Sequence, residues 1–271
     1  MRPNPLPLST RIRSNVLQAP PFLLATAIFG CISLVASLLD KHGRLQHRIA
    51  RIWAKASVAL SGSRLQVIGV DKLPADLLID RGESRMDSSS RPDAESRPHG
   101  QCVFAGNHTS YMDTPVIFAS LPFQFRILAK KELWTLPFIG WYLSRSGQLP
   151  IDTANPRATL SSLGAAVRTL RDGLSVYVFP EGSRTPDGQL QPFLNGAAYL
   201  AIRAQVPLIP VALIGVYDLL PIHTHHFYLS HKPLKLVFGN PIPTRGHTIR
   251  EADALTGQLR DAIALLIQQN S

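Results

Sequence analysis

The sequence predicts an α/β fold: a mixed, mostly parallel sheet flanked by helices, preceded by an N-terminal membrane-anchoring helical segment. Two observations carry this prediction. Short runs rich in Val, Ile, Leu and Phe alternate with helical segments along most of the chain, which is the pattern of a parallel sheet covered by helices. Near the N-terminus, residues 19–39 contain no charged side chain at all. The 271 residues, of which 45% are hydrophobic, suffice for one large domain or two small ones.

The uncharged run at residues 19–39 is long enough, as a helix, to cross a hydrocarbon core about 30 Å thick. Pro20 and Pro21 stand at its start, where a helix tolerates proline. We interpret the run as a spanning or re-entrant anchor. The alternatives are a cleaved signal peptide and a helix buried in a protein core.

Basic residues flank the run on both sides, and more of them follow it than precede it: Arg2, Arg11 and Arg13 before, and Lys41, Arg44, Arg48, Arg51 and Lys55 after. Under the positive-inside rule this asymmetry places the downstream domain in the cytoplasm, against the inner membrane. Residues 44–60 repeat apolar side chains at helical spacing with Arg and Lys between them. This pattern fits either an interfacial helix or an ordinary surface helix packed on the domain.

The chain therefore divides into a basic tail (1–18), anchoring and interfacial helices (19–62) and a main domain (63–271). Within the main domain, strands are expected at residues 64–70, 102–105, 125–129, 149–151, 176–179, 208–214 and 234–238. The clearest helix covers residues 156–172, capped by Asn155, and a second begins after a capping box at Thr248. Residues 80–100 are polar, carry both charges and lack any apolar period, so we expect a flexible insertion there.

The charge balance favours anionic partners. The net charge is +10, from 28 Lys and Arg against 18 Asp and Glu. Phospholipid surfaces, phosphorylated substrates and nucleic acids all fit such a balance, but the basic residues are scattered and lack a nucleic-acid-binding signature, so we expect no nucleic acid. Cys31 and Cys102 give no sign of a disulfide framework. The histidines between His223 and His231 lack a nearby carboxylate or cysteine at ligand spacing, which favours a surface loop over a metal site.

A histidine and an aspartate follow the expected strand at 102–105, as His108 and Asp113 in the run NHTSYMD. The end of a strand leading into a helix is where α/β folds place chemistry. We expect Ser110 to cap that helix and Asp113 to lie about one and a half turns into it. From there the carboxylate can reach back to one imidazole nitrogen, leaving the other to take a proton from an alcohol. A structural histidine beside a capping aspartate is the alternative.

Four segments, in order along the chain, resemble the motifs of glycerophospholipid acyltransferases. Asn107 to Asp113 resembles N-H-x-S-x-x-D, and Lys130 to Gly140 (KKELWTLPFIG) resembles K-x-E-L followed by P-x-x-G. Phe179 to Thr185 (FPEGSRT) is similar to F-P-E-G-T-R-S, and Val206 to Val211 (VPLIPV) to V-P-I-x-P-V. With similar flanks, the resemblance covers about residues 44–242. By these motifs the chain is identified as a member of the lysophosphatidate (1-acylglycerol-3-phosphate) acyltransferase family.

The resemblance implies an acyltransferase domain at 63–271 that moves a fatty acyl group from an acyl thioester to the 2-hydroxyl of 1-acylglycerol 3-phosphate, giving phosphatidic acid for phospholipid biosynthesis. By the motif match His108 is the general base and Asp113 its partner, while Glu181, Gly182, Arg184 and Lys130 bind the acceptor. Its partners are membrane phospholipid, the lysophospholipid and the thioester donor, which is acyl-CoA or acyl carrier protein. No cofactor or metal is expected. From the residues alone, Arg184 could instead form an ion pair with Glu181 or Asp187.

Two departures from the family pattern leave a second acceptor open. Leu194 stands where the family often has lysine, and Thr153 where it often has arginine. Two cations are therefore missing, which leaves room for a less charged acceptor such as a lyso-aminolipid. A lipid-binding scaffold without turnover, and a hydrolase with Ser110 as its nucleophile, are the remaining hypotheses.

Overall fold

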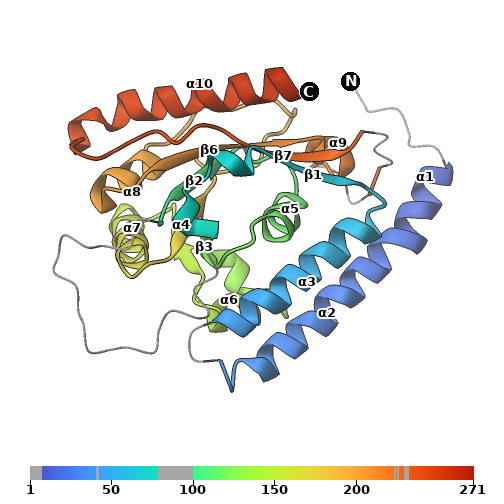
Figure 1. Ribbon diagram of the computed structural model, residues 1–271. Coiled ribbons are helices and arrows are strands. Elements are labelled where there is room, and N and C mark those ends of the chain that lie inside the picture. The colour runs from blue at the N-terminus through green and yellow to red at the C-terminus, as the bar shows by residue number, and fades with distance from the viewer. Residues whose placement is uncertain (1–7, 41–42, 79–99, 223, 225, 229–231) are drawn as a thin grey trace.

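The computed structural model describes residues 8–40, 43–78, 100–222, 224, 226–228 and 232–271 (Figure 1). In that part of the chain one seven-stranded sheet has the order β1-β7-β6-β2-β5-β3-β4. Its strands are β1 (Leu65–Ile68), β2 (Val103–Gly106), β3 (Phe125–Lys130), β4 (Leu149–Ile151), β5 (Ser175–Val178), β6 (Leu208–Ile214) and β7 (Leu234–Phe238). All neighbouring pairs are parallel except β6 and β7, which are antiparallel. The mixed, mostly parallel α/β fold is thus confirmed, with every predicted strand end within two residues.

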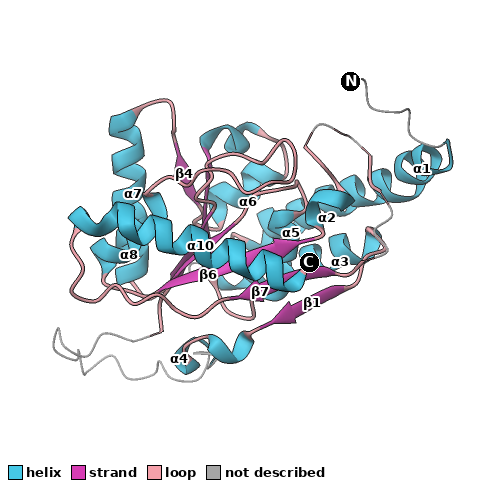
Figure 2. Ribbon diagram, turned by 90° about the horizontal axis from the view of Figure 1, so that it is seen from above, coloured by secondary structure: helices cyan, strands magenta, loops and turns pink. Residues whose placement is uncertain are grey.

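Helices cover both faces of the sheet (Figure 2). The face toward α3 (Arg44–Leu60) and α5 (Asp113–Ser120) buries side chains such as Phe104 and Tyr177. The other face packs on α7 (Pro156–Arg171), α8 (Gly196–Ala204) and α10 (Ala252–Asn270), and buries Val103 and Val176. Because both faces are buried, the central strands β2 (VFAG) and β6 (LIPVALI) are apolar at every position, which is why each appears in the sequence as a short continuous hydrophobic run.

The remaining elements are short. They are α4 (Ala75–Leu78), α6 (Ile139–Arg145), α9 (Val216–Leu219) and the 3₁₀ turns Val70–Lys72, Lys131–Thr135 and Ile249–Glu251. The two predicted caps are confirmed: the Asn155 side chain accepts from the backbone N–H groups at the start of α7, and Thr248 and Glu251 form the capping box before α10. The predicted insertion at 80–100 lies, apart from Gly100, outside the described residues.

The N-terminal segment is one helix from Leu8 to Ala36, made of α1 (Leu8–Ile12), a π-helical stretch (Arg13–Gln18) and α2 (Ala19–Ala36). It lies along α3 (Figure 1). The Trp53 indole donates to Thr26 Oγ1 at 3.1 Å, and Gly30 packs against Phe138. The predicted boundary at residue 19 therefore falls inside a continuous helix.

Helix α3 belongs to the globular domain, because Ala50, Ala54 and Val58 lie in the same core cluster as the sheet. Of the two interpretations of residues 44–60, packing on the domain is the one the structure shows, and the predicted boundary at residue 63 separates α3 from its own core.

The helix Leu8–Ala36 is long and apolar enough to cross a membrane, and only 17% of its most apolar window is buried. Large apolar side chains on it face away from α3: Leu23, Leu24, Ile28, Ile32 and Val35 are exposed. The interpretation as a buried core helix is therefore wrong. By its length and composition, this helix suggests membrane association.

Candidate active site

Three neighbouring strands deliver the predicted site residues to one edge of the sheet. His108 follows β2, Glu181 to Arg184 follow β5, and Lys130 ends β3. Strands β2, β5 and β3 are adjacent and parallel, so their carboxyl ends lie side by side. This is the edge at which open α/β sheets bind ligands.

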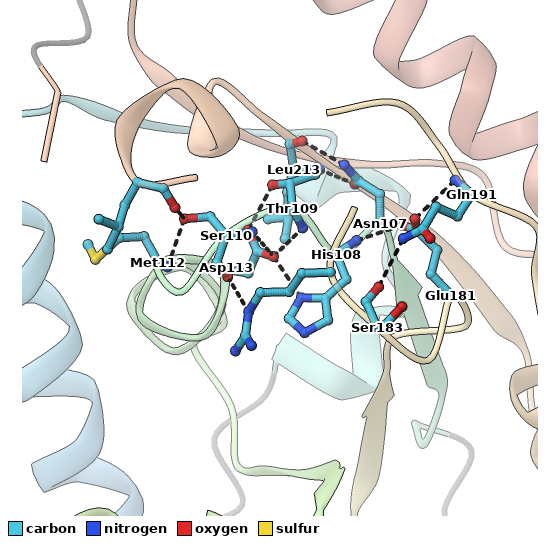
Figure 3. Close-up of polar contacts among 12 residues, drawn as sticks. Asn107, His108, Thr109, Ser110, Met112, Asp113, Glu181, Ser183, Gln191 and Leu213 are labelled. Atoms are coloured by element: carbon cyan, nitrogen blue, oxygen red, sulfur yellow. Dashed lines mark hydrogen bonds and ion pairs between the residues drawn. The ribbon is translucent and has the colours of Figure 1, made fainter. Parts of the chain in front are cut away.

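The imidazole of His108 and the carboxylate of Asp113 are in direct contact (Figure 3). His108 Nδ1 lies 2.7 Å from Asp113 Oδ2. The same oxygen accepts from the backbone N–H groups of Thr109 at 2.6 Å and Ser110 at 2.9 Å, and Oδ1 accepts from the Thr109 hydroxyl at 3.1 Å. The Asp113 side chain is buried and accepts hydrogen bonds at both oxygens, so Nδ1 of His108 is the donor in this pair.

The local geometry corrects two predictions. Asp113 is the first residue of α5 and does not lie one and a half turns into it. Ser110 does not cap that helix: its hydroxyl donates to the Leu220 carbonyl at 2.7 Å and accepts from the Met112 N–H at 3.0 Å. Instead, the Asp113 carboxylate reaches back over the loop and accepts from the backbone N–H groups of Thr109 and Ser110.

Burial sets the protonation state of His108. Its side chain is only 12% exposed. Desolvation lowers the pKa of His108 below its ordinary value, the bond to Asp113 opposes this, and the positive charges of Arg184 and Lys130 lower the pKa further. The imidazole is therefore neutral at pH 7, with Nε2 as its unprotonated nitrogen. Phe179 stacks on the ring, with centroids 3.7 Å apart and planes inclined by 16°.

Two side chains tie the His108 loop to neighbouring segments of the sheet. Asn107 exchanges two hydrogen bonds with the backbone of Leu213 in β6, at 2.9 and 2.7 Å. Glu181 accepts from the His108 backbone N–H at 2.7 Å and from the Gln191 N–H at 3.0 Å, and burial raises the pKa of this carboxyl (Figure 3). Glu181 therefore holds the His108 loop in place.

The guanidinium of Arg184 lies beside this loop. Its Nε donates to the Ser110 carbonyl at 3.0 Å, and its Cζ lies 4.5 Å from the centre of the Tyr111 ring. Within the described chain Arg184 forms no ion pair with Glu181 or Asp187, so the ion-pair alternative is wrong. Gly182 has φ +70°, where a side chain would be strained and would meet Leu194.

The two lysines differ. Lys130 is close enough to His108 to lower its pKa, whereas Lys131 pairs with Asp152 at 2.6 Å on the surface. Sequence reasoning missed the contributions of Phe179 and Tyr111 because each depends on a contact between loops of different strands. No group of three or more metal-ligating side chains occurs where the chain is described, and His223, His225 and His231 lie outside that part.

Comparison with known proteins agrees with the motifs. A family model described as Acyltransferase matches residues 86–214. The 1-acyl-sn-glycerol-3-phosphate acyltransferase BAT2, chloroplastic, of Brassica napus is 29% identical over 84% of this chain and 58% of its own length. The human 1-acyl-sn-glycerol-3-phosphate acyltransferase beta is 32% identical over 59% of this chain and 56% of its own. Residues 86–214 of this chain therefore resemble the acyltransferase family.

These relatives carry the name 1-acyl-sn-glycerol-3-phosphate acyltransferase, so the comparison confirms the resemblance that the motifs indicated. The chain spans only 60% of the length of a further chloroplastic relative, from Arabidopsis thaliana. Its fold is that of the 1-acyl-sn-glycerophosphate (LPA) acyltransferase PlsC from Thermotoga maritima, with a TM-score of 0.72 over 96% of this chain and 97% of the other, at 21% identity.

Proposed function

We propose that the chain transfers a fatty acyl group from an acyl thioester to the 2-hydroxyl of 1-acylglycerol 3-phosphate, giving phosphatidic acid. The observation that carries the proposal is the His108–Asp113 pair, in which a buried neutral imidazole presents Nε2 at the ligand-binding edge of the sheet. The names of the relatives supply the reaction class.

The reaction needs one base that later serves as an acid. His108 Nε2 takes the proton of the acceptor hydroxyl as the oxygen attacks the thioester carbonyl, and a C–O bond forms. Asp113 stabilises the resulting imidazolium through Nδ1–H. When the tetrahedral intermediate collapses, the C–S bond breaks and the imidazolium returns its proton to the departing thiolate. Neither a covalent enzyme intermediate nor a cofactor is required.

Cations beside His108 suit a phosphate on the acceptor. Arg184 supplies a forked donor and Lys130 a further positive charge. Phospholipid biosynthesis at the cytoplasmic face of the inner membrane would supply the lysolipid from the bilayer and the thioester from solution. The net charge of +10 and the exposed apolar side of the N-terminal helix support that location.

The test is acyl transfer from labelled acyl-CoA to 1-acylglycerol 3-phosphate, in membranes carrying the wild type or His108→Ala. We expect activity in the wild type and loss in the variant. Full activity in His108→Ala would overturn the mechanism. If neither sample exceeds background, the same assay with acyl carrier protein thioesters decides whether the donor or the acceptor is wrong.

A second acceptor, such as a lyso-aminolipid, is favoured by one observation. Leu194 is 60% exposed and borders Gly182, so an apolar side chain stands beside the anion-binding loop. A panel of lysolipids with different head groups separates this acceptor from the first. Ser110 gives no support to a hydrolase, because its hydroxyl is buried and bonded to the Leu220 carbonyl.

A further inference from the structure

The guanidinium of Arg184 is held in two ways that leave one of its edges unused. Its Nε donates to the Ser110 carbonyl at 3.0 Å. A guanidinium offers two bidentate edges, one formed by Nε with one terminal nitrogen and one by the two terminal nitrogens. The first edge is occupied by Ser110. Among the described residues, the two terminal nitrogens donate to no protein acceptor, so the end-on edge remains for a ligand.

A single hydrogen bond at Nε lets the guanidinium swing about that bond, so a second contact is needed to fix its plane. Tyr111 provides it, since the guanidinium carbon lies 4.5 Å from the centre of its ring. The backbone on either side of Tyr111 is anchored: the Ser110 hydroxyl donates to the Leu220 carbonyl, and the Met112 side chain is fully buried.

Tyr111 itself is 46% exposed, although tyrosine is a large side chain to leave on a surface. Packing in the core therefore does not account for the ring at this position. The arginine beneath it does, because an exposed aromatic face can still hold a cation.

We propose that Tyr111 is a positioning residue, whose ring holds Arg184 so that its terminal nitrogens bind the phosphate of the acceptor end-on beside His108. The proposal rests on the proposed function and adds a residue to it. It also accounts for arginine at position 184, because a lysine has no second edge with which to bind phosphate while it donates to Ser110.

The first test compares Tyr111→Leu with the wild type in steady-state acyl transfer. A cation–π contact at a half-exposed site corresponds to a rise in KM for 1-acylglycerol 3-phosphate of about twofold to fivefold, with kcat within about twofold. Tyr111→Phe retains the aromatic face and should restore the KM of the wild type. If KM stays unchanged in Tyr111→Leu, or if Tyr111→Phe raises it equally, the proposal is wrong.

A double-mutant cycle separates positioning from a general loss of structure. On an Arg184→Gln background, Tyr111→Leu should have no further effect on KM, because the cation it holds is gone. Additive effects would mean that the two side chains act independently, and would overturn the proposal.

Direct binding separates failure of this inference from failure of the proposed function. In isothermal titration calorimetry with glycerol 3-phosphate, the wild type should bind most tightly, Tyr111→Leu more weakly, and Arg184→Gln most weakly. If the three proteins bind in this order but the wild type transfers no acyl group, the proposed reaction fails and the inference about Tyr111 stands. If the wild type and Tyr111→Leu bind glycerol 3-phosphate equally, or if neither binds it, the inference fails.

Discussion

Asp113 receives four hydrogen bonds from three consecutive residues, Nδ1–H of His108, two backbone N–H groups and the Thr109 hydroxyl. An amide in its place could accept at only one atom, and its NH₂ group would face donors. We expect Asp113→Asn to lower kcat by about 10²- to 10⁴-fold, because the imidazolium loses its partner and Nδ1–H its acceptor. Steady-state kinetics measures kcat, and a thermal melt shows whether the variant is folded. A folded variant with kcat near the wild-type value would contradict the assigned role.

The pH dependence of kcat/KM follows from the environment of His108. Its base form is the neutral imidazole, and burial lowers the pKa of His108 below its ordinary value of about 6.5. The rate should therefore rise with pH through a midpoint below 6.5 and be level at neutrality. Removing the charge of Arg184 with Arg184→Gln should move the midpoint upward, because that charge lowers the pKa. A midpoint above 6.5 in the wild type would contradict a buried neutral base.

At this scale the sequence predicted the dyad, because the spacing of His108 and Asp113 is local. It did not predict the ring of Phe179 on His108, nor Glu181 against the His108 backbone. Both contacts join the ends of β2 and β5, which are adjacent in the sheet but separated by β3 and β4 in the chain. The pairing order of strands is a property of the folded sheet, and residue types at one position do not encode it.

Among the elements, strands and capped helices were predictable because each carries its own signal. The run VYV of β5 and the Asn155 cap of α7 can be recognised from the local sequence, without knowing which segments they pack against. The N-terminal helix was different. Its length and lack of charge could be seen in the sequence. Its packing on the domain depends on single contacts, such as that of Gly30 with Phe138 at the start of α6, which a hydrophobic pattern does not predict.

The contact at Gly30 gives a test of that docking. A Cβ at position 30 would lie 2.7 Å from Phe138 Cβ, which is closer than two non-bonded carbon atoms approach in proteins. We expect Gly30→Val to destabilise the protein by about 1–3 kcal/mol through overpacking. Thermal melts in detergent compare it with Leu23→Val, a change at an exposed position of the same helix. Equal stability of the two variants would show that α2 does not pack on the domain.

On the scale of the whole molecule, the N-terminal helix and the active site are joined by one segment of chain. The carbonyl of Leu220 accepts from Ser110 in the His108 loop, and the backbone N–H of Phe227 donates to the buried Ser14 hydroxyl at 2.8 Å. Phe227 also packs edge-on against Phe22 of α2. The helix that suggests membrane association is thus tied to the edge of the sheet where a lipid acceptor would bind.

The exposed side of that helix provides the last prediction. Leu23 and Leu24 are 64% and 61% exposed, and transferring a leucine side chain from water into the bilayer contributes about 1.5–3 kcal/mol. We expect the double change Leu23→Glu and Leu24→Glu to release the protein from anionic phospholipid vesicles in a sedimentation assay. Leu160→Glu is the control, because Leu160 is equally exposed, at 60%, but lies on α7 away from α2 (Figure 1). Release of the control to the same extent would mean that added negative charge, rather than the apolar side of the N-terminal helix, governs attachment. Continued binding of the double variant would assign attachment to the basic residues or to another surface.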